Sequence, residues 1–348
     1  MNVNVIRRAP ELLMPAMLIL GTAVLGLVVS SYLQAYFLDT LVKVSIVVAL
    51  YLFMGNSGVL SFGHISFVAL GAWTAGVLTV PADQKRVVMP GLAHFLVTTN
   101  VGNIASLALA AALGGAFAFA VGLPLMRLSG LAAGIATFAV LEITNNMLTY
   151  EQRIGPGLNA FSSVPSTTGI WQAAIGALIC VVLAYAYQRT RFGRMLRATR
   201  EDPAAASATG ISIYRQRLLA FTLSGALAGF AGGMYVHLQP LQAGGLHLDL
   251  TFITLAMVVV GGAGSLLGAV LGAIVLNGIY SFFQAATNSV DVFGWNLTVP
   301  SGTAEIVLGV LMVVVLILRP EGISGGREFS LPRRRRPVAD LEKARATT

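Results

Sequence analysis

The chain consists largely of apolar runs about as long as a lipid bilayer is thick. Of its 348 residues, 56% are apolar and only 10% are charged. An ordinary soluble domain has about a quarter of its residues charged, and it needs them at its surface because charged side chains are almost never buried unpaired. The composition therefore excludes a water-soluble globule and predicts an integral membrane protein.

The apolar runs also predict how often the chain crosses the membrane. A crossing helix needs about 20 apolar residues, and runs of this kind lie at residues 12–30, 102–126, 128–149, 169–187, 218–238 and 303–318. Two shorter runs flank a glycine-rich polar insert, and the run 250–283 is too long for one crossing. Backbone groups in hydrocarbon must be hydrogen-bonded within their own segment. The predicted fold class is all-α, a polytopic membrane helix bundle of about nine or ten transmembrane segments with broken helices.

The arginines predict the orientation of these segments. Seven lie in the loop 189–217, and six more are Arg319, Arg327 and the run 333–336. Basic residues concentrate on the cytoplasmic side of a membrane. With both termini in the cytoplasm, six crossings lead to the loop, and an even number must follow it. The run 250–283 must then form two helices. We divide the chain into a transmembrane domain, 1–330, and a basic cytoplasmic tail, 331–348. Because the basic clusters flank apolar runs, we expect a lipid bilayer and no nucleic acid as partner.

The sequence contains no signature of ATP binding. A phosphate-binding loop needs Gly-Lys followed by Ser or Thr, and none of Lys43, Lys85 and Lys343 follows a glycine. The energy for any transport must come from an ion gradient or from another polypeptide. The single cysteine, Cys180, allows neither an internal disulfide nor a thiolate metal cluster. The histidines lack the spacing of metal ligands, and no Ser-His-Asp or Cys-His set lies on a common structural element. We therefore expect no metal, no cofactor and no enzyme activity.

The loop 189–217 contains the pattern of one short helix. Asp202 can cap its start, Pro203 suits the first helical position, and Gly210 can end it in the left-handed conformation. The helix would have about two turns and a length of roughly 12 Å. So short a helix is marginal by itself in water. It is either a surface helix ordered by its own membrane domain or a coupling helix that docks into a soluble ATPase.

Four segments resemble one known family, and they occur in the family's order. They are RFGRMLRATREDPAAA at 191–206 with TGI at 209–211, GNSGVLSFGH at 55–64 with Phe67 and GAW at 71–73, VGGAGSLLG at 260–268, and RPEGI at 319–323. Together they resemble the branched-chain amino-acid permeases of ABC importers, and more closely the Liv-type M subunit. Pro203 and Trp73 depart from the family's common residues.

The resemblance implies a permease subunit of a binding-protein-dependent ABC importer in the bacterial inner membrane. Its solute would be a branched-chain amino acid, urea, or another small amide or acid. Its partners would be a second homologous permease, two cytoplasmic ATP-binding subunits and a periplasmic solute-binding protein. The residues implied in ATPase coupling are Arg200, Glu201, Asp202, Pro203, Ala204, Ala205, Ser207 and Gly210, and the implied hinge glycines are Gly261, Gly262 and Gly264.

The polar insert 55–64 allows two interpretations. Irregular polar backbone at membrane depth is tolerated where it is buried in protein or lines a cavity. The insert is therefore either a broken helix beside the translocation pathway or a tightly packed segment whose hydroxyls bond across helices. The candidate pathway residues in it are Asn56, Ser57, Ser61 and His64.

Glu142 lies inside a predicted span and shares a helical face with Asn145 and Asn146. Carboxylates in membrane spans usually face a bundle interior or a water-filled cavity. We therefore predict that this face borders the pathway, although a structural hydrogen-bond network would explain it too. The alternative function is an ion-coupled secondary transporter that works without an ATPase and uses Glu142 as its proton or cation site. Because we find no strong charge cluster in the membrane, we expect a neutral or zwitterionic solute.

Overall fold

The computed structural model describes residues 9–151, 153–154, 157, 163–238, 246–287, 290–292, 295–319 and 321–325. Helices dominate this part of the chain, and its β structure is one hairpin, in which β1 (Val290–Val292) pairs with β2 (Trp295–Leu297) in antiparallel fashion. The prediction of an all-α bundle is confirmed. The N-terminal arginines and the basic tail 331–348, which the sequence assigns to the cytoplasm, lie outside the described residues.

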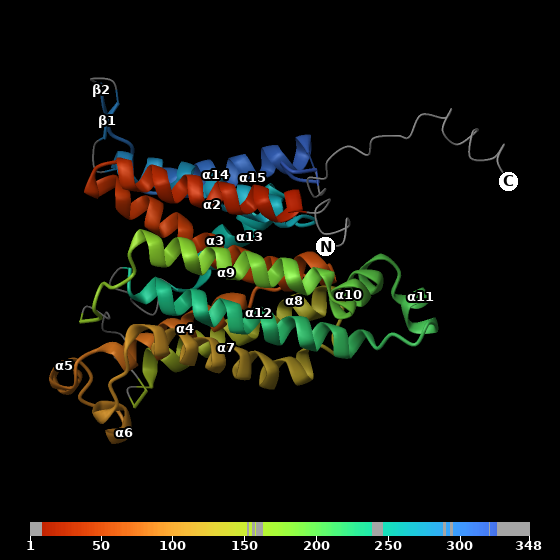
Figure 1. The fold of residues 1–348 in the computed structure, drawn as a ribbon, viewed down its shortest axis with the longest axis horizontal. Helices are drawn as coiled ribbons and strands as arrows, with labels where there is room; N and C mark the ends of the chain where they lie inside the picture. Colours follow the sequence, from red (N-terminus) through yellow and green to blue (C-terminus); the bar gives the residue numbers. More distant parts are fainter. Residues whose placement is uncertain are drawn as a thin grey trace, which may run out of the picture.

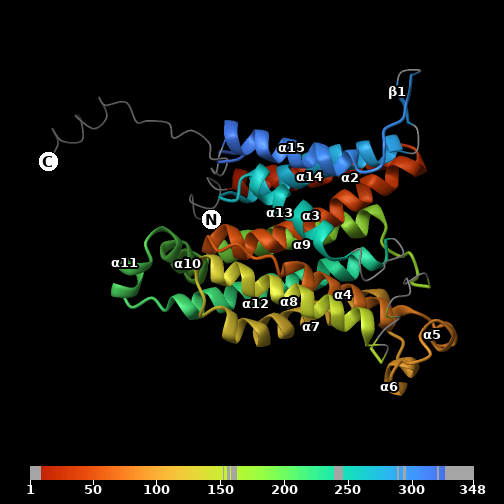
Figure 2. The same ribbon diagram turned by 180° about the vertical axis from the view of Figure 1, so that it is seen from behind.

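Ten of the described helices have 14 residues or more, and Figures 1 and 2 show the long helices running along the bundle. Seven are long and apolar enough to cross a membrane, within the described residues: α2 (Ala9–Val28), α3 (Ser31–Ser57), α7 (Asn103–Leu125), α8 (Gly130–Tyr150), α9 (Ile170–Arg189), α12 (Ile213–Val236) and α14 (Leu266–Thr287). Three are shorter: α4 (His64–Thr79), α13 (Leu248–Gly261) and α15 (Thr303–Leu318). Short helices lie at the two ends: α5 (Ala82–Val88), α6 (His94–Thr98), α10 (Arg191–Glu201) and α11 (Pro203–Ala208).

The end of the bundle that is formed by α10 and α11 is called the basic end here, and the opposite end the far end (Figure 1). At the basic end, Arg189 of α9 pairs with Glu11 near the start of α2. At the far end, the Val101 amide donates to the Leu78 carbonyl at 3.0 Å, which joins the end of α4 to the start of α7. Six helices along the bundle, α2, α3, α4, α7, α8 and α9, thus precede α10, which agrees with the six crossings that the sequence predicts before the loop 189–217.

Four further helices of the bundle, α12 to α15, follow α11, because the run 250–283 is divided into two helices. Gly262, with φ of 113°, separates α13 from α14. Glycine adopts a positive φ of this size readily, whereas a residue with a side chain would be strained. The turn lies at the basic end, since a Cβ on Gly55 at the end of α3 would stand 2.8 Å from the Ala263 carbonyl oxygen. The predicted division of this run is confirmed.

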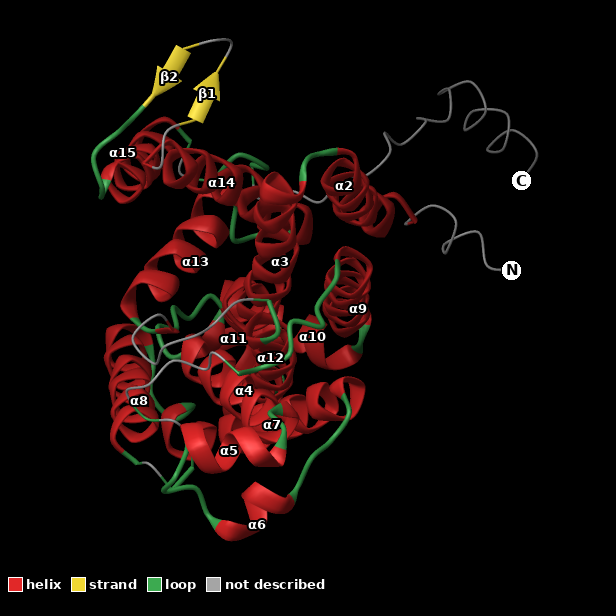
Figure 3. Ribbon diagram, turned by 90° about the vertical axis from the view of Figure 1, so that its left-hand side faces the viewer, coloured by secondary structure: helices red, strands yellow, loops and turns green. Residues whose placement is uncertain are grey.

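Helix α12 lies in the middle of the bundle, where it packs against α7, α4 and α3 (Figure 3). Glycines bring these helices together. A Cβ on Gly229 would stand 2.4 Å from the Ala110 carbonyl oxygen of α7, and one on Gly71 of α4 would stand 2.1 Å from the Gly229 carbonyl oxygen. Small residues permit such close backbone approach between membrane helices. Beyond α3, helices α2, α14 and α15 form a second group, visible at the top of Figure 3.

At the far end, Lys85 holds α5 against the chain that leaves α6. Its buried ammonium donates to the carbonyl oxygens of Leu96, at 2.9 Å, and Thr99, at 2.5 Å. Burial lowers the pKa of Lys85 from its usual value, because removal from water disfavours the charged form. The two carbonyls offset part of that cost by accepting hydrogen bonds from the ammonium.

The close packing of α12 predicts a selective effect of added methyl groups. Gly229→Ala should lower the unfolding temperature, because overpacking a tight interface costs about 1–3 kcal/mol. Gly278→Ala on α14 is the matched control, since nothing lies within 4 Å of a Cβ there. Thermal unfolding of the purified protein in nanodiscs, followed by tryptophan fluorescence, measures the difference. Equal melting of the two variants would contradict this account of the packing.

Candidate functional site

The side chains of Ser61, His64 and Ser224 form a hydrogen-bonded series that we call the serine–histidine chain. The Ser224 Oγ donates to the Ala49 carbonyl oxygen at 2.6 Å, so it can only accept from His64 Nε2, which lies 2.7 Å away. His64 Nδ1 is left to accept from the Ser61 hydroxyl at 2.8 Å. With one proton for each link, the imidazole is neutral and protonated on Nε2.

Aromatic rings enclose this chain near the middle of the bundle. Phe53, Phe67 and Phe221 lie with their ring centroids 5.4–5.6 Å from that of His64, which is 2% exposed. The serine–histidine chain therefore links the start of α4 to α12 and α3. Two of the candidate pathway residues, Ser61 and His64, thus bond to each other locally, and His64 also bonds across helices to Ser224. Their role in the pathway stays a prediction.

The other two candidates of the insert, Asn56 and Ser57, lie at the basic end of α3, where α10 meets it. Arg197 Nε donates to Asn56 Oδ1 at 2.7 Å, and Arg200 Nη1 donates to the Gly55 carbonyl oxygen at 2.5 Å. These two contacts are called the arginine clasp here. Ser57 accepts from the Val59 amide at 3.2 Å. Arginines suit this position, because the last carbonyls of a helix have no partner within it.

The clasp fits a tight turn at the end of α3. Gly58 has φ of 70° and caps the helix in the left-handed conformation, as glycine does most readily. A Cβ at this position would stand 2.9 Å from Cγ of Arg200. The missing side chain therefore leaves room for the arginine to lie over the helix end.

Helix α11 projects from the basic end, beyond the rest of the bundle (Figure 1). Asp202 Oδ1 accepts from the amides of Ala204, at 2.9 Å, and Ala205, at 3.0 Å, which caps the helix as predicted. Gly210 has the expected positive φ, of 82°. The helix ends at Ala208, one residue earlier than expected, because Thr209 already serves as its C-cap.

Most of α11 is exposed. Among the predicted coupling residues, these side chains are exposed: Arg200, Glu201, Asp202, Pro203, Ala204, Ala205 and Ser207. Only Ala206 in the described helix is buried, and its carbonyl accepts from the Ile211 amide at 3.1 Å. The helix therefore presents nearly its whole surface to the surroundings instead of packing into its own membrane domain.

Glu142 has a partner that the sequence did not indicate. Its Oε1 lies 2.9 Å from Nε2 of His247, the residue just before α13. The Glu142 side chain is nevertheless 37% exposed. Asn145 is half-buried and Asn146 is exposed on the same helix, where Asn146 donates to the Glu142 carbonyl at 2.8 Å. Glu142, Asn145 and Asn146 thus form a polar stripe on the surface of α8.

The predicted hinge glycines lie in the α13–α14 turn, which the segment after α15 holds in place. A Cβ on Gly261 would stand 2.0 Å from the Gly268 carbonyl oxygen. The Ser324 amide donates to the Gly261 carbonyl at 3.1 Å, beside Gly262. Gly264 is half-buried in the turn. The first two glycines are needed for close packing here, and whether the turn also moves as a hinge stays a prediction.

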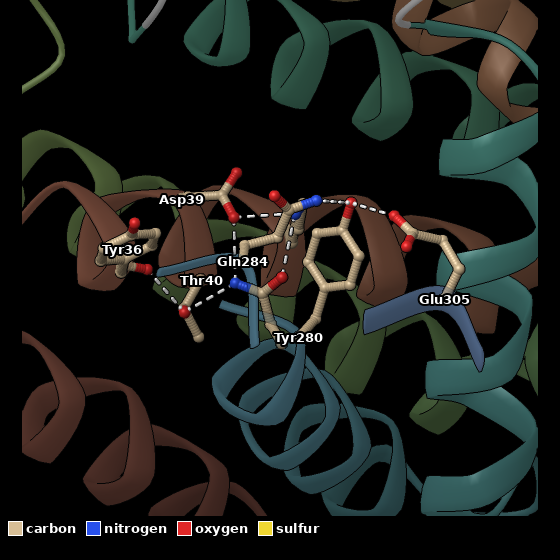
Figure 4. A network of polar contacts seen from close by, with 8 residues as sticks. Tyr36, Asp39, Thr40, Tyr280, Gln284 and Glu305 are labelled. Atoms are coloured by element: carbon tan, nitrogen blue, oxygen red, sulfur yellow. Dashed lines mark hydrogen bonds and ion pairs between the residues drawn. The ribbon is translucent and has the colours of Figure 1, made fainter. Parts of the chain in front are cut away.

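A group of polar residues that the sequence analysis missed joins α3 to α14 (Figure 4). Lys43 Nζ lies 2.7 Å from Asp39 Oδ2 and 2.9 Å from Asn277 Oδ1, and Asn277 donates back to Asp39 at 3.0 Å. These three residues are called the ion-pair cluster here. The sequence analysis did not identify this buried ion pair. Opposite charges four residues apart within one apolar helix were the signal that could have found it.

A family model described as "Branched-chain amino acid transport system / permease component" matches residues 32–316. The high-affinity branched-chain amino acid transport system permease protein LivM of Escherichia coli K12 is 28% identical, over 82% of this chain and 68% of its own.

Two further relatives come from other organisms. The probable permease LivM of Methanocaldococcus jannaschii is 23% identical over 82% of this chain and 91% of its own. The autoinducer 2 import permease LsrC of Klebsiella pneumoniae is 31% identical over 45% and 44%. No solved structure shows a significant match to the chain.

The serine–histidine chain predicts unequal effects for two buried serines. Ser224→Ala should destabilise the protein by about 1–3 kcal/mol, because it leaves the His64 Nε2–H without an acceptor. Ser66→Ala is the control, since Ser66 is buried on α4 and its hydroxyl has no hydrogen-bond partner among the described residues. Unfolding in nanodiscs with increasing denaturant measures both. A Ser66→Ala variant as unstable as Ser224→Ala would argue against the series of bonds.

Proposed function

The chain belongs to the family of branched-chain amino acid transport permeases, and on this premise we propose how it works within a binding-protein-dependent ABC importer. It is a membrane permease subunit, and such permeases act with an ATPase and a solute-binding protein. We propose a second homologous permease, two cytoplasmic ATP-binding subunits and one periplasmic binding protein as its partners. Its solute is a branched-chain amino acid or a related small polar compound, and the chain itself catalyses no reaction.

We propose that the basic end faces the cytoplasm of a bacterial inner membrane, with both chain termini on that side. The charge bias supports this orientation, since the arginines of α10 and of the α9 and α12 ends gather there. The far end, with α5, α6 and the hairpin, then faces the binding protein. The described chain enters α2 and leaves α15 at the same end, because ten crossings separate them.

The observation on which the proposal rests most is the exposed helix α11. Its capped start and its left-handed end keep it helical while it projects from the basic end. A helix of six residues is too short to be stable alone, so an exposed one is expected to gain its packing from a partner. We infer that a cleft on the ATP-binding subunit covers it.

The arginine clasp offers a route by which movement of α11 reaches the membrane domain. Helix α10 continues directly into α11 at Asp202, so a shift of one displaces the other. Arg197 and Arg200 then connect α10 to the last turn of α3. The serine–histidine chain lies on the next segment, at the start of α4. ATP binding must therefore favour one arrangement of these contacts over another, since only a difference between states can shift their populations.

We propose that the polar stripe on α8 borders the translocation pathway, together with His247. A carboxylate facing lipid costs at least about 2.5–3.5 kcal/mol, and Glu142 is partly exposed near the middle of an otherwise apolar helix. The stripe therefore faces a second permease or water. Helix α13 begins next to His247 and ends at Gly261. We propose that α13 pivots about the turn at Gly261 and Gly262.

The helix α11 provides a test of the function. The chain is co-expressed with its ATP-binding and permease partners and reconstituted into vesicles with binding protein. Asp202→Ala should weaken co-purification of the ATP-binding subunit and ATP-driven leucine uptake, because losing the N-cap costs about 1 kcal/mol of helix stability. Asp202→Asn should retain both, since asparagine caps equally well.

The same vesicles separate this function from ion-coupled transport. Uptake is expected to require ATP and to persist when a protonophore collapses the proton gradient. If vesicles that contain this chain alone accumulate leucine on a proton gradient, the importer function is refuted.

The arginine clasp predicts that coupling can be lost without loss of assembly. Arg200→Gln should leave the ATPase bound and active but lower the leucine transported per ATP by about tenfold, because a hydrogen bond from a charged donor contributes about 1.5–3 kcal/mol. Arg194→Gln is the matched control, an exposed arginine on the same helix. The ratio of uptake to phosphate release measures the effect. An unchanged ratio in Arg200→Gln would exclude the clasp from coupling.

A further inference from the structure

A cavity of about 400 Å³ lies between α3, α12, α13 and α14, towards the far end of the bundle. We call it the outer cavity. Its lining includes three charged side chains and three tyrosines: Asp39, Lys43, Asp249, Tyr36, Tyr235 and Tyr280. Tyr235 belongs to the last turn of α12 and Asp249 to the first turn of α13. Charged groups of both signs thus line one cavity near the proposed periplasmic side.

One wall of the cavity is the ion-pair cluster, which is held in a fixed geometry. Lys43 is 5% exposed, and its ammonium also lies 5.2 Å from the ring centre of Tyr280. An ammonium has three N–H groups, and the described residues supply Lys43 with two oxygen partners, on Asp39 and Asn277. One N–H donor remains on a buried cation beside the cavity.

The charged side chains that line the cavity carry a net negative charge, because Asp249 adds a second carboxylate. Asp39 and Lys43 neutralise each other, whereas the Asp249 side chain is exposed and has no hydrogen-bond or ion-pair partner among the other described residues. The tyrosine rings add their negative faces, which attract cations. Tyr280 is fixed in turn, since its hydroxyl donates to Glu305 at 3.3 Å and accepts from Gln284 at 2.9 Å (Figure 4). The cavity therefore favours a cationic group near Asp249.

We propose that the outer cavity binds a primary ammonium group that has an anionic oxygen a few bonds away, as in an α-amino acid. The ammonium lies between Asp249 and the tyrosines, and the anionic oxygen accepts the remaining N–H of Lys43. An uncharged solute such as urea can hydrogen-bond to the same groups but adds no charge to either contact, so we expect it to bind more weakly. The inference rests on the proposed transport function and gives the permease a solute site of its own, separate from that of the binding protein. The headgroup of phosphatidylethanolamine offers the same two groups.

The test uses the complete transporter without binding protein, in nanodiscs of phosphatidylcholine and phosphatidylglycerol. Saturation-transfer NMR measures the binding of three probes: L-leucine, 3-methylbutylamine, which lacks the carboxylate, and 4-methylpentanoate, which lacks the ammonium. Leucine is expected to bind best and 4-methylpentanoate worst. Asp249→Asn should raise the Kd for leucine about tenfold, the loss expected of one charge-assisted hydrogen bond.

Two controls accompany this variant. Asp83→Asn removes an equally exposed carboxylate of α5, outside the cavity, and should leave the Kd unchanged. Tyr280→Phe keeps the aromatic face and should keep most of the binding, whereas Tyr280→Leu should weaken it. Equal binding of leucine and 4-methylpentanoate, or an Asp249→Asn variant that binds leucine like the wild type, would overturn the proposal.

A second set of nanodiscs identifies the source of the ammonium. If added phosphatidylethanolamine competes with leucine in the wild type, the lipid headgroup occupies the same site; if it does not, the solute is the occupant. ATP-driven uptake separates failure of this site from failure of the function. If the wild type transports leucine but the Asp249→Asn variant binds leucine as well as the wild type does, the site is refuted and the importer function is not. If leucine binding depends on Asp249 but the vesicles show no ATP-driven uptake, the importer function is refuted and the site is not.

Discussion

The absence of water from the membrane interior is the constraint on which the rest of this structure depends. A polar group there must find its partner within the protein, since an unpaired one costs several kcal/mol in hydrocarbon. The backbone meets this demand by forming helices. The polar side chains meet it by bonding between helices, as His64 does with Ser224 and Lys43 with Asn277. The same bonds fix which helices are neighbours.

Glycines allow the second level of organisation, the close approach of helix backbones. Helix α12 can occupy the middle of the bundle because α4 and α7 reach it without intervening side chains at Gly71 and Gly229. Packing of this kind resists deformation. A displacement at one end of such a unit is therefore passed on as a movement of whole helices. This rigidity is what the proposed coupling from α11 through the arginine clasp requires.

The polar groups differ in how completely they are satisfied, and this difference separates structural from functional candidates. The serine–histidine chain uses each of its protons in one bond and is enclosed by aromatic rings. Glu142 and Asp249 are partly or largely exposed although they belong to apolar helices. Groups of the first kind join helices, whereas groups of the second kind remain able to meet a solute, water or a partner subunit.

The sequence by itself determined the all-α class, the crossing pattern, the broken run at Gly262 and the short helix that Asp202 caps. Each of these follows from the length of apolar runs, the bias of arginines or local backbone chemistry, all of which act over a few neighbouring residues. Only the tertiary structure decided that Glu142 meets His247, that Lys43 meets Asn277 and that Arg200 lies over the end of α3. These partners are more than a hundred residues apart in the chain, and no local pattern encodes a pairing that arises only when the helices pack.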